Sequence, residues 1–84
     1  MTAYVAGIDI GSAYTKAVVL SGSRILGWSV VASGNDYRAA AQTVLNEALN
    51  AASLDSGSIA WTVATGTGAA TVTGADHIVN EITA

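Results

Sequence analysis

The sequence predicts a small α/β domain in which a mixed β-sheet carries a helix on one face. Three short blocks of strand-forming residues occupy the first third of the chain, and brief Gly- and Ser-containing turns separate them. A block with helical spacing follows, and then another strand-forming block. Because strand, helix and strand in succession form a right-handed crossover, the last block should lie parallel to a strand of the first group.

The first three blocks are predicted strands over Tyr4–Ile10, Thr15–Leu20 and Arg24–Val31. Each is rich in β-branched and other apolar residues, which favour extended structure. The connections are too short for a crossover helix, so consecutive strands should pair as hairpins. The expected result is an antiparallel meander of three strands.

The spacing of the apolar residues changes after Ser33, and a helix is predicted from Asp36 to about Ala52. Asn35 or Asp36 can cap its first free amides. Apolar residues then recur on one helical face: Tyr37, Ala41, Val44, Leu45, Ala48 and Ala52. The block Ile59–Thr65 is apolar on both faces and is predicted to be a buried strand.

The last part of the chain is predicted to start a second helix. Asp76 can cap this helix, and Ile78, Val79 and Ile82 would form its apolar side. No residue typical of a helix end closes it before Ala84, so we expect the structural unit to continue. The expected organisation is a single truncated domain that covers residues 1–84.

The amino-acid composition argues against several classes of binding partner. The 84 residues include three Lys or Arg, six Asp or Glu and no Cys, and 11% are charged while 51% are hydrophobic. So few basic residues argue against binding to nucleic acid or to an anionic membrane, and no aliphatic run approaches the ~18 residues of a membrane span. We therefore expect a cytoplasmic protein whose undercharged surface is covered by self-association or by a partner subunit.

The residues that carry chemistry follow the first predicted strand. That strand delivers Asp9 to its carboxyl end, and a Gly11-Ser12 turn leads to Thr15 and Lys16. Asp9 can hold Mg²⁺, and Gly11 lets the backbone approach phosphate oxygens. Ser12, Thr15 and Lys16 can donate hydrogen bonds or positive charge. The combination suits a triphosphate with a divalent cation.

An ordinary hairpin uses the same residue types. In that interpretation Asp9 is a solvated residue at a strand end and Lys16 is a surface charge. The motif is neither a Walker A loop nor a dinucleotide fingerprint, because the required glycine spacing is missing. Gly66, in the turn after the last predicted strand, could line a nucleotide cleft or simply close a tight turn. Trp28 and Trp61 are expected to be core or interface residues.

Two stretches in order resemble a known family. Gly7-Ile8-Asp9-Ile10-Gly11-Ser12, with Thr15-Lys16, is similar to the first phosphate motif of the acetate kinase, sugar kinase, heat-shock chaperone and actin ATPase superfamily. The later stretches 63–68 and 75–83 are similar to the start of the activator ATPases of 2-hydroxyacyl-CoA dehydratases and of the ATPase subunits of benzoyl-CoA reductases. The resemblance covers essentially the whole chain.

The resemblance implies an incomplete ribonuclease H-like half of an actin-like ATPase. It implies ATP binding and hydrolysis that drive low-potential electron transfer to a CoA-thioester dehydratase or reductase, with ATP and Mg²⁺ as cofactors. The [4Fe–4S] cluster of full-length members needs cysteines that this chain does not contain. The implied nucleotide-binding residues are Asp9, Gly11, Ser12, Ala13, Thr15, Lys16 and Gly66, with Asp9 as the metal-binding residue.

The sequence also departs from the family. The family usually has Gly, Tyr, Gly and Arg after the threonine that corresponds to Thr65, but residues 66–69 here are Gly, Thr, Gly and Ala. Ala84 falls where many relatives have a cysteine. We therefore expect at most a phosphate-binding half-site in the isolated chain, without turnover. The alternatives are a non-catalytic docking module derived from this fold, or part of a sugar or acyl kinase.

Overall fold

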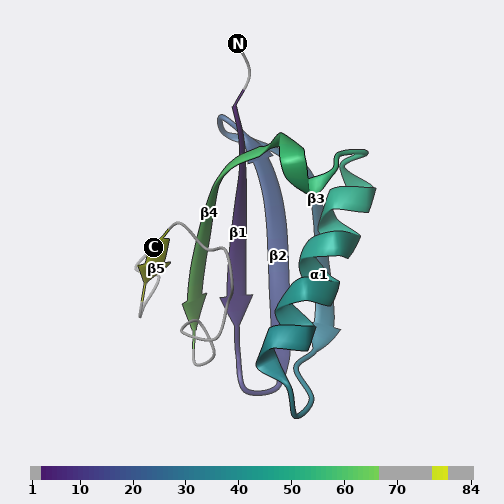
Figure 1. Ribbon diagram of the computed structural model, residues 1–84, viewed down its shortest axis with the longest axis vertical. Helices are drawn as coiled ribbons and strands as arrows, with labels where there is room; N and C mark the ends of the chain where they lie inside the picture. Colours follow the sequence, from purple (N-terminus) through teal and green to yellow (C-terminus); the bar gives the residue numbers. More distant parts are fainter. Residues whose placement is uncertain (1–2, 67–76, 80–84) are drawn as a thin grey trace.

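The computed structural model describes residues 3–66 and 77–79 and contains one mixed β-sheet with a helix against one face (Figure 1). The sheet has five strands in the order β3-β2-β1-β4-β5. The strands are β1 (Tyr4–Ile10), β2 (Tyr14–Ser21), β3 (Arg24–Ala32), β4 (Ile59–Gly66) and β5 (His77–Val79). The helix α1 spans Tyr37–Ala51, and a short 3-10 helix, η1, spans Ser56–Ser58.

The strand directions confirm the predicted topology. β1 pairs antiparallel with β2, and β2 pairs antiparallel with β3, so the first three strands form the expected meander. β4 follows α1 and pairs in parallel with β1. The predicted crossover is therefore present, and it makes β1 the middle strand of the sheet.

Local hydrogen bonds fix both ends of α1. The Asp36 carboxylate accepts a hydrogen bond from the Ala39 amide at 3.1 Å, which confirms the predicted cap. At the other end the Leu54 amide donates to the Leu49 carbonyl at 2.9 Å. Ser53 lies between them with φ +58, the left-handed conformation that ends many helices.

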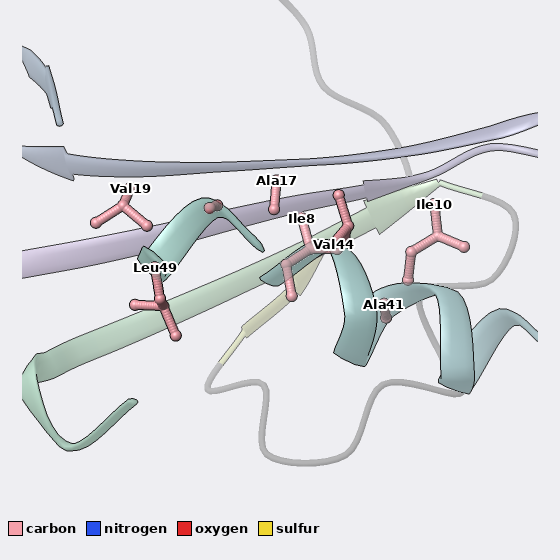
Figure 2. Packing of buried hydrophobic residues seen from close by; sticks show 8 residues of the cluster. Ile8, Ile10, Ala17, Val19, Ala41, Val44 and Leu49 are labelled. Atoms are coloured by element: carbon pink, nitrogen blue, oxygen red, sulfur yellow. The ribbon is translucent and has the colours of Figure 1, made fainter. Parts of the chain in front are cut away.

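The core lies between α1 and the sheet. Alternate residues of β1 and β2 point toward the helix, and they meet its apolar face in a buried cluster (Figure 2). Its members are Ile8, Ile10, Ala17, Val19, Ala41, Val44, Ala48 and Leu49. The helix passes so close to β3 that a Cβ at Gly27 would lie 2.5 Å from the Ala48 carbonyl oxygen. Ser29 of β3 also donates a 2.6 Å hydrogen bond to Glu47 of α1.

The prediction of a helix after Asp76 is wrong at His77–Val79, which form β5. Ile78 and Val79 are β-branched, and residues of this kind suit a strand at least as well as a helix. β4 offers a free edge, and β5 pairs with it in parallel from Val63 to Thr65. Backbone pairing with that edge outweighs the helical spacing. The rest of the predicted helix, at position 76 and over 80–84, lies outside the described residues.

The second face of the sheet has no helix over it among the described residues. Trp28 is 65% exposed and Trp61 is 47% exposed, so neither is a core residue. Gly7 has no side chain, and around it lies an open hollow of about 310 Å³ whose apolar walls include Val18, Trp28 and Val63. We call this surface the open face. In the part of the chain that is described, no helix combines the length and apolar character needed to cross a bilayer.

Candidate functional site

A row of three polar side chains crosses the sheet at one end of the open face. Asp9 of β1 is the register partner of Lys16 on β2 and of Thr65 on β4. All three line the hollow of the open face. Asp9 and Lys16 are exposed, whereas Thr65 is 3% exposed. The sheet thus places a cation on one side of the Asp9 carboxylate and a hydroxyl on the other.

The turn after β1 is tight. The Gly11 amide donates a 2.9 Å hydrogen bond to the Tyr14 carbonyl. A Cβ at Gly11 would lie 2.7 Å from the same oxygen, so only glycine fits there without a shift of the backbone. Ser12 and Ala13 form the exposed tip of the turn, next to the end of β1 that carries Asp9. A phosphate could therefore approach this turn from solvent.

Thr15 lies on the other face of the sheet from Asp9 and Lys16. Its side chain is fully buried, and its hydroxyl is 2.8 Å from the Ser33 hydroxyl. Ser33 donates its only hydroxyl proton to the Gly11 carbonyl at 2.6 Å, so Thr15 must be the donor to Ser33. The Ser33 amide also donates to the Ala13 carbonyl at 2.9 Å. Ser33 therefore holds the turn at two points, and Thr15 supports Ser33.

Gly66 brings the end of β4 against the end of β1. Its φ is +95, a conformation that favours glycine. A Cβ at this position would collide with the Ile10 carbonyl oxygen and would lie 2.8 Å from Asp9 Oδ1. The space that a side chain would fill is therefore taken by the Asp9 carboxylate and the β1 backbone.

The structure gathers most of the predicted site residues and separates one from the rest. The residues at the joined ends of β1, β2 and β4 are Asp9, Gly11, Ser12, Ala13, Lys16 and Gly66. Thr15 alone points to the helix side. Sequence reasoning missed Ser33 and Thr65 as site residues, because only the strand register places them beside the turn and beside Asp9.

The arrangement suits a cation that arrives with a phosphate. No group of three or more His, Cys, Asp or Glu gathers within residues 3–66 and 77–79. Mg²⁺ is commonly held by one or two carboxylates together with water and substrate phosphates. Asp9, with the glycine turn and Lys16 beside it, fits that pattern. The sequence has no Cys, so it does not fit the ligand set of a [4Fe–4S] cluster.

Comparison with known proteins adds relatives of known structure. No protein-family model and no curated protein matches the sequence. Component A of the (R)-2-hydroxyglutaryl-CoA dehydratase of Acidaminococcus fermentans is 33% identical, with a TM-score of 0.84 over 92% of this chain. The activator of the 2-hydroxyisocaproyl-CoA dehydratase from Clostridium difficile, solved with bound ADPNP, is 30% identical, with a TM-score of 0.82 over 90%.

This chain corresponds to only a part of each of these two larger proteins. This chain spans 30% of the length of the first protein and 28% of the second. Within that span the similarity includes both the fold and the sequence, as the two stretches around Asp9 and Thr65 predict. The chain is thus similar, over nearly all of its own length, to a part of the activator components of 2-hydroxyacyl-CoA dehydratases, and its α/β fold is a partial actin-like ATPase fold.

Proposed function

We propose that this chain is the ATP-binding part of an ATPase that drives low-potential electron transfer to a CoA-thioester dehydratase. One observation carries the proposal. The Asp9 carboxylate, the Gly11 turn and Lys16 lie together at the end of β1, in a chain similar to an activator that was solved with bound ADPNP. A benzoyl-CoA reductase is a second possible electron acceptor, on the resemblance alone. We also place the protein in the cytoplasm, as expected from its composition.

We assign a separate role in nucleotide binding to each residue of the candidate site. Asp9 would hold Mg²⁺, usually through water, and when bound this ion would neutralise charge on the phosphates. The backbone of Gly11, Ser12 and Ala13 would approach the phosphate oxygens, and the Lys16 ammonium would bind them directly. Thr15 takes an indirect role in this scheme, because its hydroxyl is bonded to Ser33 and stabilises the turn from behind.

Nucleotide binding by this chain need not be accompanied by ATP hydrolysis. Hydrolysis of ATP requires a positioned water, a metal and neutralising groups around the γ-phosphate. Among the described residues, we propose a single turn, at Gly11, as a phosphate-binding element. We therefore expect the isolated chain to bind MgATP and to hydrolyse it no faster than a buffer control. Metal-dependent hydrolysis that disappears in Asp9→Asn would contradict the half-site, because a second copy would then have to complete the site.

Calorimetric titration with ATP, with and without Mg²⁺, tests the binding roles. Asp9→Asn should weaken MgATP binding and leave metal-free ATP nearly unchanged, because it removes a charge that repels the bare triphosphate. Lys16→Ala should weaken both forms, by about 1.5–3 kcal/mol for one charge-assisted hydrogen bond. Arg24→Ala is the matched control, since Arg24 is an exposed base at the far end of β2 and β3.

One outcome of the titration would contradict the proposed nucleotide site. If Lys16→Ala binds ATP like the parent chain in both conditions, Gly11-Ser12 is only a hairpin turn and the proposed nucleotide site is wrong. Loss of binding in Arg24→Ala would point instead to nonspecific attraction between the anion and any base.

The second candidate function is a docking module, and the open face favours it. Trp28 and Trp61 are both exposed on this face, and an apolar hollow lies beside Trp28. Exposed apolar surface of this kind often marks a contact with another chain. A second copy or a partner subunit would cover it. This function is compatible with nucleotide binding, because Asp9 and Lys16 are at the end of the hollow rather than beneath the tryptophans.

A further inference from the structure

Thr65 is an exception among the buried polar side chains. The buried polar residues are Thr15, Ser33 and Thr65. Thr15 and Ser33 are bonded to each other and to the Gly11 turn. Thr65 Oγ1 has no hydrogen-bond partner within the described part of the chain, although the residue is only 3% exposed. A buried hydroxyl without a partner destabilises a fold, so its presence needs a physical reason.

The position of Thr65 supplies that reason. It is the register partner of Asp9 and lines the same hollow. The next residue, Gly66, lies so near the Asp9 carboxylate that a Cβ there would be 2.8 Å from Asp9 Oδ1. Thr65 is therefore beside Asp9 on the β4 side, whereas Lys16 is beside Asp9 on the β2 side.

The two neighbours of Asp9 differ in what they can bind. A lysine ammonium only donates hydrogen bonds, so it suits phosphate oxygens and repels a metal ion. A threonine hydroxyl can also accept, so it can bind a water molecule whose protons point away from a metal. Mg²⁺ usually keeps several such waters. By this chemistry, Lys16 suits a phosphate on the β2 side of Asp9, and Thr65 suits a hydrated metal ion on the β4 side.

We infer that Thr65 belongs to this site, and that its hydroxyl accepts a hydrogen bond from a water molecule bound to the divalent cation at Asp9. This inference rests on the proposed function and assigns the β4 side of the site to the metal. Thr65 is a positioning residue in this scheme, because it touches the metal-bound water and not the phosphate.

The test uses Thr65→Val, which keeps the shape and removes the hydroxyl, and Thr65→Ser, which keeps the hydroxyl. Thr65→Val should raise the Tm by several degrees, since it removes an unpartnered buried group. It should weaken MgATP binding about tenfold and leave metal-free ATP binding unchanged. Thr65→Ser should retain MgATP binding close to that of the parent. Thr43→Val, on the exposed side of α1, is the matched control.

A second readout locates the metal directly. In NMR spectra of the parent chain, Mn²⁺ added with ATP should broaden the Thr65 methyl resonance strongly and that of Thr43 little. MgATP binding by Thr65→Val at the parent's affinity would overturn the inference while leaving the proposed function in place. Equal weakening of metal-free ATP and MgATP would overturn the metal assignment, because the hydroxyl would then contact phosphate. A parent chain that binds no MgATP would overturn the proposed function and this inference together.

Discussion

The Asp9 carboxylate lies in the space where a side chain at Gly66 would be, 2.8 Å from the position that a Cβ would take. β1 and β4 run in parallel and end together, so Asp9, one residue before the end of β1, meets Gly66 at the end of β4. The carboxyl ends of parallel strands are a common place for ligands in α/β proteins. In this chain the contact joins the two stretches that carry the resemblance to the dehydratase activators.

Gly66→Ala should damage both the fold and the site. The substitution forces a Cβ into the Ile10 carbonyl and into Asp9, at a φ that alanine adopts poorly, and should cost about 2–3 kcal/mol of unfolding free energy. Gly34→Ala separates the two causes, because Gly34 also has a positive φ but has nothing within 4 Å. It should cost about 1 kcal/mol and leave MgATP binding intact. Equal losses of stability in urea unfolding would show that the collision is unimportant.

The hydroxyl pair behind the turn should act as a unit. Ser33→Ala removes the hydrogen bond to Gly11 and leaves the buried Thr15 hydroxyl without its partner, at a cost of about 1–3 kcal/mol. Thr15→Val should cost less, because Ser33 remains bonded to the turn. The double variant should be less destabilised than the sum of the two, which thermal or urea unfolding of all four proteins would measure. Additive losses would mean that the pair is not coupled.

Gly27 sets how closely α1 can approach the sheet. Gly27→Ala places a methyl 2.5 Å from the Ala48 carbonyl oxygen and 2.7 Å from the Ala52 amide nitrogen, so the helix must move. We expect a loss of about 1–3 kcal/mol in urea unfolding. Gly7→Ala is the control on the opposite face, since its nearest neighbour would be Val18 Cγ1 at 3.4 Å. It should leave stability unchanged or slightly raised. A tolerated alanine at 27 would show that the helix is further from β3.

We expect the open face to mediate self-association of the chain. Trp28 is 65% exposed and lines the hollow, so Trp28→Lys adds charge without removing core packing. We expect the parent chain to self-associate at micromolar concentration and the variant to do so much less, as light scattering would measure. Thr43→Lys is the control, because Thr43 is exposed on α1, on the other side of the sheet. A parent chain that stays monomeric would show that this face needs no second copy.

The strands and α1 could be predicted because their signals are local. The alternation in Tyr4–Ile10 and the helical spacing after Asp36 each depend on neighbours in sequence, and both elements form where predicted. β5 was predicted as a helix because its pairing depends on β4, whose free edge is not visible in the sequence at His77–Val79.

The same contrast between local and long-range signals applies to the candidate site. The Asp9 and Gly11 pattern could be recognised from spacing, and Gly66 from its place in the turn after the last predicted strand. The face of each residue depends on register. Thr15 follows the turn in sequence, yet it points to the helix side and meets Ser33, which comes from the end of β3. Thr65 joins Asp9 only through the parallel pairing of β1 and β4.

The parallel pairing of β1 with β4 also has a consequence for the order of folding. The two hairpins of β1, β2 and β3 close short loops, and α1 packs onto them, so these contacts can form early. β4 can reach β1 only after the chain has passed along the whole helix. We therefore expect Asp9 to be in place before Gly66 arrives, so that the site is completed late in folding. Amides of β4 should exchange with deuterium faster than those of β2, because opening this one strand undoes the site and leaves the hairpins intact.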